Sequence, residues 1–124
     1  MKWNQDSILQ KRVDELVEKL EFGHINSKRV VVFKSAGSKA RAYARIWGFP
    51  RIWQQALDLK PHYCLEVISE KFDRLTSDDQ NRVLIHELLH IPKNFSGALL
   101  SHRGVKRKID SRSVERLYKQ VRKK

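Results

Sequence analysis

Sulfur-containing residues are scarce in this chain of 124 residues, which has one cysteine, Cys64, and one methionine, Met1. A single cysteine excludes an internal disulfide and is typical of proteins from a reducing compartment. Long apolar runs are missing too, because no stretch approaches the ~20 residues that span a bilayer. The first twenty residues are charged throughout and lack the apolar core of a signal peptide. We therefore expect a soluble, cytoplasmic protein without a membrane partner.

Internal repeats and low-complexity linkers are absent from the sequence as well. The length matches one domain, since domains mostly run ~100–150 residues. The sequence thus predicts a single domain over residues 1–124, which we expect to be a monomer. Cys64 lies in an alternating apolar context, and we interpret it as a packed thiol rather than a nucleophile or a ligand.

Acidic residues are few: 14 Asp and Glu stand against 26 Lys and Arg, a net charge of +12. The excess is concentrated in residues 28–60 and 103–124, which contain eight and ten Lys or Arg. Such uneven charge creates a positive surface that attracts polyanions, nucleic acid first among them. The residues expected to contact nucleic acid are Arg41, Arg45, Lys106, Arg107 and Lys108.

Hydrophobic spacing predicts an α+β fold with a small, largely antiparallel sheet. Residues 6–20 have the apolar stripe of a helix, with Asp6 or Ser7 as its cap and Gly23 as its stop. Alternating or β-branched runs predict strands, and a second amphipathic stripe predicts a basic C-terminal helix. The predicted strands cover residues 28–34, 40–47 and 62–69, and a short helix or irregular segment covers 51–59. The last helix is expected to have Asp110 or Ser111 as its cap and an apolar face of Val114, Leu117, Tyr118 and Val121.

Two features have alternative interpretations: the place of one strand in the sheet, and the role of two tryptophans. The strand at 62–69 precedes the motif helix described next, so it forms either the lip of a substrate cleft or an internal strand of the core. Trp47 and Trp53 could stack on nucleic-acid bases. Because they lie beside Gly48 and Pro50, we interpret them instead as core or cleft-wall residues.

The segment "HELLH", residues 86–90, carries the strongest chemical signal. Residues four apart lie on one side of a helix, so His86 and His90 can both present a nitrogen to one ion. Glu87 lies about 100° round the helix, where it can reach a water on the metal but is not an equivalent ligand. Thr76 or Ser77 is the expected cap of this helix, Leu84, Leu88 and Ile91 have core spacing, and Pro92 is expected to end it just after His90. The alternative is an ordinary amphipathic helix with two semi-exposed histidines.

A metal held this way needs at least a third protein ligand, and His102 is the natural candidate. It follows a turn that contains Gly97. The competing ligands in the sequence are His62, Glu66, Glu70 and Asp73 upstream, and Asp110 and Glu115 downstream.

The stretch "RVLIHELLHIPKNFSGALLSHRG" resembles a family of small metallopeptidases of phages and archaea that share H-E-L-L-H-I-P, F-S-G-x-L and a later histidine. The segments "ARIWGFPRIWQQAL" and "HYCLEVISEKFDRL" resemble that family too, so the likeness covers residues 40–104. It implies a zincin-like minidomain with His86, His90 and His102 as zinc ligands and Glu87 as the catalytic acid/base. SprT-like proteases, which act on DNA-bound proteins, are similar more distantly. Metzincins do not fit, because Lys93 and Ser96 occupy the places of their glycine and third histidine, and no methionine follows.

The sequence therefore predicts a zinc-dependent metallopeptidase that hydrolyses a protein or peptide substrate. In this hypothesis, Zn²⁺ lowers the pKa of a bound water to ~7 and Glu87 takes the proton of that water. The alternative is a nucleic-acid-binding protein with a structural zinc site. An open metal position distinguishes the first from the second, since a structural zinc is closed by four protein ligands.

Overall fold

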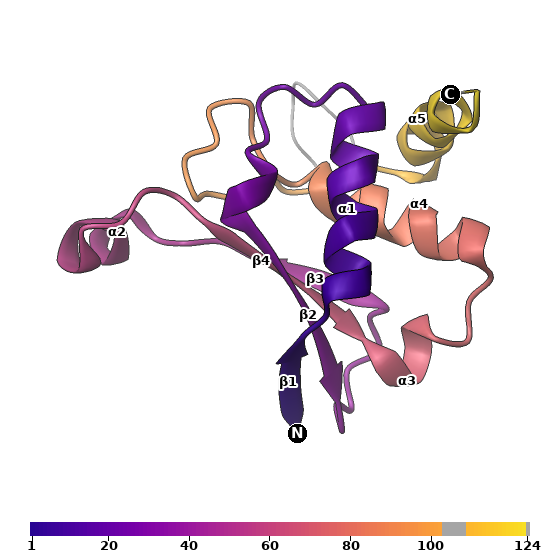
Figure 1. Ribbon diagram of the computed structural model, residues 1–124, viewed down its shortest axis with the longest axis horizontal. Helices are drawn as coiled ribbons and strands as arrows, with labels where there is room; N and C mark the ends of the chain where they lie inside the picture. The colour runs from indigo at the N-terminus through magenta and orange to yellow at the C-terminus, as the bar shows by residue number, and fades with distance from the viewer. Residues whose placement is uncertain (103–108, 124) are drawn as a thin grey trace.

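A four-stranded mixed sheet is the centre of the fold in the computed structural model, which describes residues 1–102 and 109–123 (Figure 1). The strands are β1 (Lys2–Gln5), β2 (Val30–Ala36), β3 (Ala44–Trp47) and β4 (Tyr63–Ile68). Their order across the sheet is β1-β2-β4-β3. The outer pairs β1–β2 and β3–β4 are antiparallel and the inner pair β2–β4 is parallel. The predicted α+β class with a largely antiparallel sheet is confirmed.

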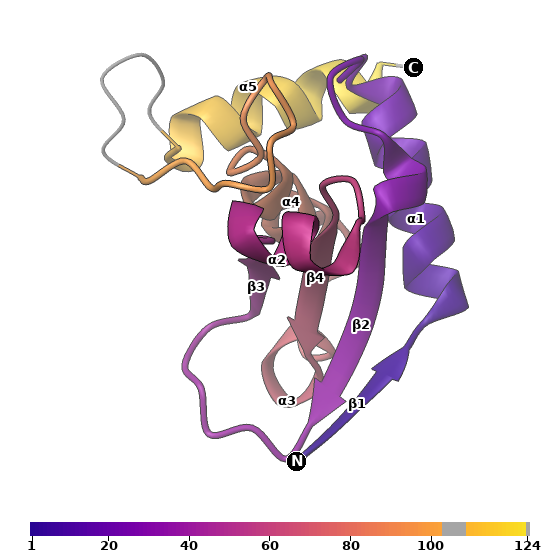
Figure 2. The same cartoon turned by 90° about the vertical axis from the view of Figure 1, so that its left-hand side faces the viewer.

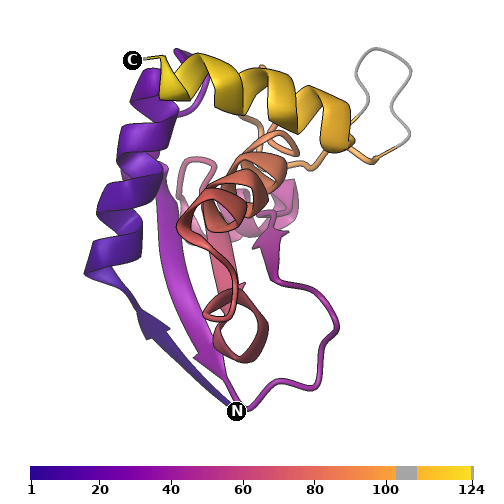
Figure 3. The same cartoon turned by 90° about the vertical axis from the view of Figure 1, so that its right-hand side faces the viewer.

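Five α-helices occur in the described part of the chain. They are α1 (Ser7–Lys19), α2 (Arg51–Leu57), α3 (Ser69–Phe72), α4 (Ser77–Leu88) and α5 (Ser111–Arg122), and a 3₁₀ turn, η1 (Ser27–Arg29), precedes β2. Figure 3 shows α1, α4 and α5 on the near side of the sheet. Figure 2, from the opposite side, shows α2 in front of the strands. No residue of α2 is buried, so it adds little to the core.

Helix α1 begins where the sequence predicts and ends earlier. The Asp6 side chain accepts the N–H of Leu9, as expected of the cap. The helix is closed by Glu21, which has a φ of 56°, and by the N–H of Phe22, which donates to the carbonyl of Val17. This is the Schellman arrangement, with a glutamate in the left-handed position that usually favours glycine. The prediction that Gly23 ends this helix was therefore wrong by two residues.

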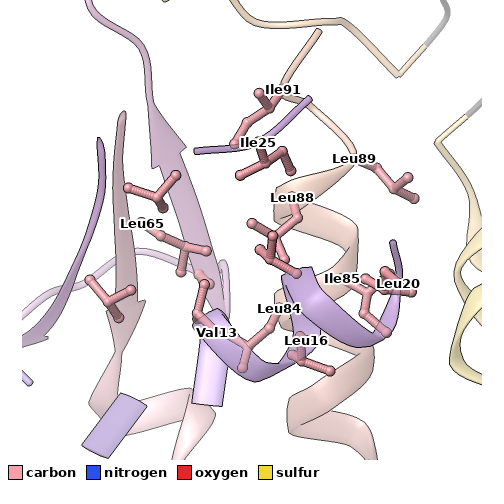
Figure 4. Packing of buried hydrophobic residues seen from close by; sticks show 14 of the residues in the cluster. Val13, Leu16, Leu20, Ile25, Leu65, Leu84, Ile85, Leu88, Leu89 and Ile91 are labelled. Atoms are coloured by element: carbon pink, nitrogen blue, oxygen red, sulfur yellow. The ribbon is translucent and has the colours of Figure 1, made fainter. Parts of the chain in front are cut away.

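The core lies between the sheet and the helices α1 and α4 (Figure 4). Leu84, Leu88 and Ile91 are fully buried, which confirms the predicted apolar face of the motif helix. They pack with side chains from α1 and β4, among them Val13, Leu16, Leu20 and Leu65. Each such side chain contributes about 1.5–3 kcal/mol through burial. This packing holds α4 firmly behind the residues of the histidine motif.

Helix α4 is capped by Thr76, whose hydroxyl accepts the N–H of Asp79, as predicted. It ends at Leu88 rather than after His90. The N–H groups of His90 and Ile91 donate to the carbonyls three residues earlier, so the last turn is tightened. Pro92 explains this, because it disfavours helical geometry at the residue before it. His90 consequently lies in a turn just beyond the helix.

Helix α5 has the predicted apolar face and cap. Asp110 and Ser113 form a reciprocal capping box. Tyr118, which is buried, donates its hydroxyl hydrogen to the carboxylate of Asp78 at the start of α4. The ion pair between Arg82 and Glu115, at 2.8 Å, joins the same two helices. The basic C-terminal helix is thus a structural neighbour of the motif helix.

Four features of the sheet region differ from the predictions. Strand β1 was not predicted, because its four residues are all exposed and carry no apolar pattern. Strand β3 begins only at Ala44, so the alternation at 40–43 is not a strand. Strand β4 is internal, between β2 and β3, which excludes the lip interpretation and makes β3 one of the two edge strands, with β1 at the other edge. Trp47 and Trp53 are 50% and 55% exposed, so neither is a core residue.

None of the helices in residues 1–102 and 109–123 is long and apolar enough to cross a membrane.

Candidate metal centre

Three histidines from two segments come together at the C-terminal end of α4. The rings of His86 and His90 lie on one side of the helix end, with centroids 5.2 Å apart. The loop that follows α4 brings the ring of His102 to 5.1 Å from His86 and 4.6 Å from His90. One ring nitrogen from each lies within 4.8 Å of the others, and the two Nε2 atoms of His86 and His102 are 3.0 Å apart. This three-histidine group could hold a metal ion.

The other candidate ligands do not join this group among the described residues: His62, Glu66, Glu70, Asp73, Asp110 and Glu115. Most of them are engaged elsewhere. Glu70 accepts the N–H of Gly37, and Asp73 pairs with Lys34 at 2.8 Å. Residues 103–108 contain no His, Cys, Asp or Glu. Among the described residues, therefore, no fourth protein ligand joins the three histidines.

His90 is held in one orientation by the backbone of Leu100. The His90 Nδ1 atom lies 2.5 Å from the carbonyl oxygen of Leu100, and the Leu100 N–H donates to the His90 carbonyl. A carbonyl can only accept, so Nδ1 carries the proton and Nε2 keeps its lone pair. Backbone contacts of this kind commonly fix the tautomer of a metal ligand.

The electrostatics of the group favour neutral imidazoles. Burial, with the neighbouring His90 and His102, lowers the pKa of His86 to about 4. Burial also lowers the pKa of His90. Neutral imidazole is the form that binds metal, so no proton competes for these two nitrogens near pH 7. The donor set therefore fits a transition metal that prefers nitrogen ligands.

Glu87 lies between His86 and His90 in the sequence and is only 8% exposed. Its Oε2 atom is buried and has no hydrogen-bond partner in the part of the chain that the structure describes. Burial raises the pKa of this carboxyl to about 7. An unpartnered buried carboxylate is costly to a fold. A group of this kind with a strongly shifted pKa is typical of a functional site.

The loop that carries His102 is fastened to β4 and to the segment after β3. The Tyr63 hydroxyl accepts the N–H of Gly97 and donates to the carbonyl of Ala98, both at 2.8 Å. The Gln54 side chain donates to the carbonyls of Phe49 and Ser96, also at 2.8 Å. Sequence reasoning missed both side chains, because Tyr63 has only a strand pattern and Gln54 lies in a segment with no clear period.

Glycine is required where these two segments meet. Gly97 has a φ of 93°, and a Cβ at Gly48 would lie 2.5 Å from the Gly97 carbonyl oxygen. The Phe49 N–H donates to that same oxygen at 2.8 Å. Gly97, expected from the sequence to form a turn before His102, thus permits a close backbone contact as well.

Two of the five residues predicted to contact nucleic acid, Arg41 and Arg45, belong to the described part of the chain. Arg45 is paired with Glu66 at 3.2 Å on β4, and Arg41 is exposed in the loop before β3. Lys106, Arg107 and Lys108 lie outside the described residues. Their contact with nucleic acid stays a prediction.

Comparison with known proteins identifies the family. Residues 1–123 match the model of a family described as "Putative phage metallopeptidase". The chain therefore belongs to this phage metallopeptidase family, and the family's description implies a bound metal and a protein or peptide substrate. No curated protein and no solved structure shows significant similarity to the chain.

Proposed function

We propose that the protein is a zinc-dependent peptidase in which His86, His90 and His102 hold the ion and Glu87 is the general base. One observation carries this proposal: three imidazole nitrogens converge beside a buried carboxylate that has no partner of its own. Imidazole ligands suit zinc, which protein sites commonly bind through histidine. A zinc ion held by three side chains polarises a peptide carbonyl and acidifies water at its open position.

Glu87 supplies the proton transfers in this proposal. Its carboxylate takes a proton from the attacking water and passes it to the leaving amine. A general base works best when its pKa lies near the working pH, and burial raises the pKa of Glu87 to about 7. The hydrogen bond to Leu100 keeps His90 oriented while this happens.

Strand β3 offers a place for an extended substrate. It pairs with β4 along one edge, and no strand of residues 1–102 or 109–123 pairs with its outer edge. It also packs against α4, the helix that carries His86 and Glu87. A peptide added to such an edge is held by main-chain hydrogen bonds, which suit substrates of varied sequence.

The ligand count favours catalysis over a structural zinc. A structural site is closed by four protein ligands, whereas a catalytic site keeps one position for water or substrate. Three histidines with no fourth His, Cys, Asp or Glu in the described group match the second arrangement. The alternative of a nucleic-acid-binding protein with a structural zinc is therefore the weaker one.

The proposal is tested by comparing Glu87→Gln with single alanine variants of the three histidines. We expect the parent, purified without added metal, to contain about one zinc per chain by elemental analysis. Glu87→Gln should keep that zinc but cleave unfolded test proteins ~10²–10⁴-fold more slowly, because the general base is lost. His86→Ala, His90→Ala and His102→Ala should each lose zinc as well as activity.

His62→Ala is the matched control, since His62 is a histidine outside the three-histidine group. It should retain both zinc and activity. A Glu87→Gln protein that cleaves as fast as the parent, or that loses zinc as the histidine variants do, would contradict the role of Glu87. Zinc-loaded parent protein that cleaves no substrate, together with histidine variants that unfold, would instead favour a structural metal.

A further inference from the structure

Figure 2 views the sheet from the side opposite α1, α4 and α5. Two half-exposed tryptophans lie on this face of the sheet. The strand register places Trp3 of β1, Glu66 of β4, and Arg45 and Trp47 of β3 on this same face. Trp3 and Trp47 belong to opposite edge strands and are 54% and 50% exposed. We call these two side chains, with Arg45 and the Glu66 beneath them, the Trp3–Trp47 platform.

Trp47 is fixed from below by Glu66, which is only 1% exposed. The Trp47 Nε1–H donates to Glu66 Oε1 at 2.9 Å, and Arg45 lies 3.2 Å from the same oxygen. Burial opposes ionisation of Glu66, but hydrogen bonding by Ser35 and Trp47, the charge of Arg45 and, least, hydrogen bonding by Trp3 outweigh it and lower its pKa. The Trp47 indole thus has its polar edge turned inward and half its surface toward solvent. A ring held this way loses little freedom on binding a flat ligand.

The surroundings of the platform are basic. The Arg45 guanidinium lies 5.7 Å from the centroid of the Trp47 ring, and its charge offsets that of Glu66. The loop between β2 and β3 adds Lys39 and Arg41, both exposed, and residues 37–43 include no acid. The chain as a whole carries a net charge of +12. A second copy of this chain would be repelled, and an uncharged protein surface would leave these cations desolvated without counter-charge.

Aromatic rings beside cations fit one class of partner best. We propose that the Trp3–Trp47 platform binds single-stranded nucleic acid, with bases stacked on the two indoles and phosphates paired with Arg45, Arg41 and Lys39. Every base has a π-face, so stacking of this kind tolerates many sequences. In duplex nucleic acid the bases are already stacked on each other, so no base face is free to stack on Trp3 or Trp47. This binding is separate from the proposed peptidase chemistry and uses neither the three histidines nor Glu87, although Arg45 and Trp47 belong to β3, the strand proposed to pair with a substrate.

The first experiment measures anisotropy of labelled oligo(dT), oligo(U) and a duplex of equal length, at low and at moderate salt. Both single strands should bind more tightly than the duplex, and their affinity should fall as salt rises, because phosphate contacts release counterions. Trp3→Leu and Trp47→Leu should each weaken single-strand binding roughly 5- to 150-fold, the range expected from losing one stacked base. The comparison of oligo(dT) with oligo(U) distinguishes DNA from RNA as the natural ligand.

Trp53→Leu is the matched control, because Trp53 is 55% exposed but lies on α2. It should bind single strands as the parent does. Unchanged binding in both platform variants would overturn the proposal, as would equal affinity for duplex and single strands. So would loss of binding only when Arg112, Arg116 and Lys119 of α5 are replaced by glutamine.

A second measurement avoids any dependence on the folding of the variants. The parent protein is photo-crosslinked to an oligonucleotide that contains 5-iodouracil, and the modified peptides are identified by mass spectrometry. Crosslinks at Trp3 or Trp47 would support the platform. Crosslinks confined to Trp53 or to residues 109–123 would overturn it.

Discussion

Two buried glutamates, Glu66 and Glu87, lie in opposite kinds of environment. Glu66 has donors at one oxygen: its Oε1 accepts the Trp47 Nε1–H and lies 3.2 Å from Arg45, and these contacts help to lower its pKa despite its burial, although its Oε2 has no hydrogen-bond partner among the described residues. Glu87 has a buried oxygen without a partner in the described structure, and burial raises its pKa to about 7. One carboxyl therefore stays ionised and organises the side chains above it. The other is able to exchange a proton near pH 7, as the proposed catalysis requires.

The comparison shows that burial alone does not decide what a carboxyl does. Glu66 and Glu87 are 1% and 8% exposed, so desolvation disfavours the charge of both. The difference lies in the donors that each one faces. A carboxyl with donors is stabilised as an anion, whereas one without them remains available for a proton.

Removing each carboxylate should have opposite effects on stability, and this is the largest effect that we expect. Glu66→Gln should lower the free energy of unfolding by about 2–4 kcal/mol, because a buried ion pair loses one partner. This loss is smaller than for a fully buried pair, because the Arg45 side chain is 39% exposed and solvent screens its charge. Glu87→Gln should not lower it in the metal-free protein. Urea unfolding at pH 7 measures both. Equal losses in the two variants would contradict the distinction between the carboxyls.

The pH dependence of stability should sharpen the same distinction for Glu87. A carboxyl whose pKa is raised from 4.5 to about 7 on folding holds more protons folded than unfolded between those values, so stability falls as pH rises through this window. Glu87→Gln removes this loss. The variant should therefore gain about 2 kcal/mol over the metal-free parent between pH 5 and pH 8.

The histidines of the group change the free energy of unfolding with pH in the opposite direction. This contribution cancels when the unfolding free energies of the two proteins are subtracted. The pKa of His86 is lowered to about 4, so it contributes stability that rises with pH between about 4 and its ordinary 6.5. Parent and Glu87→Gln share this contribution. Urea unfolding of both metal-free proteins at several pH values gives the difference, and a constant difference would show that Glu87 does not titrate near pH 7.

The sequence predicted the histidine motif better than the residues that support it. His86, Glu87 and His90 follow from helix geometry, because their spacing alone places them together. His102 followed from a turn and the need for a third ligand. Tyr63 and Gln54, which fasten the loop of His102, have no local pattern, since their partners lie 34 and 42 residues away in the chain.

The sheet was predicted in outline but not in order. Hydrophobic alternation indicated the strands at β2 and β4, yet no local rule states which strand lies in the middle. Trp3 belongs to a strand whose four residues are all exposed, so nothing in the pattern marked it. The Trp3–Trp47 platform could therefore not be predicted, because it depends on which edges the two short strands occupy.

The smallest expected effect tests a single hydrogen bond to Glu66. Trp47→Phe keeps an aromatic ring but removes the Nε1–H that donates to Glu66 at 2.9 Å. We expect a loss of about 1 kcal/mol at pH 7, typical of one such bond to a charged acceptor and discounted for the half-exposed ring.

A carboxyl with a lowered pKa contributes stability that is present above its ordinary value of 4.5 and is lost as pH falls through the folded value. Without the indole donor the folded pKa should rise toward 4.5, so the gap between parent and variant should narrow as the pH falls below about 4. Urea unfolding at pH 7 and pH 3, with Trp53→Phe as the control that has no such bond, measures this gap. If the difference in unfolding free energy is the same at both pH values, the packing of the Trp47 ring, and not its bond to Glu66, stabilises the sheet face that carries the Trp3–Trp47 platform.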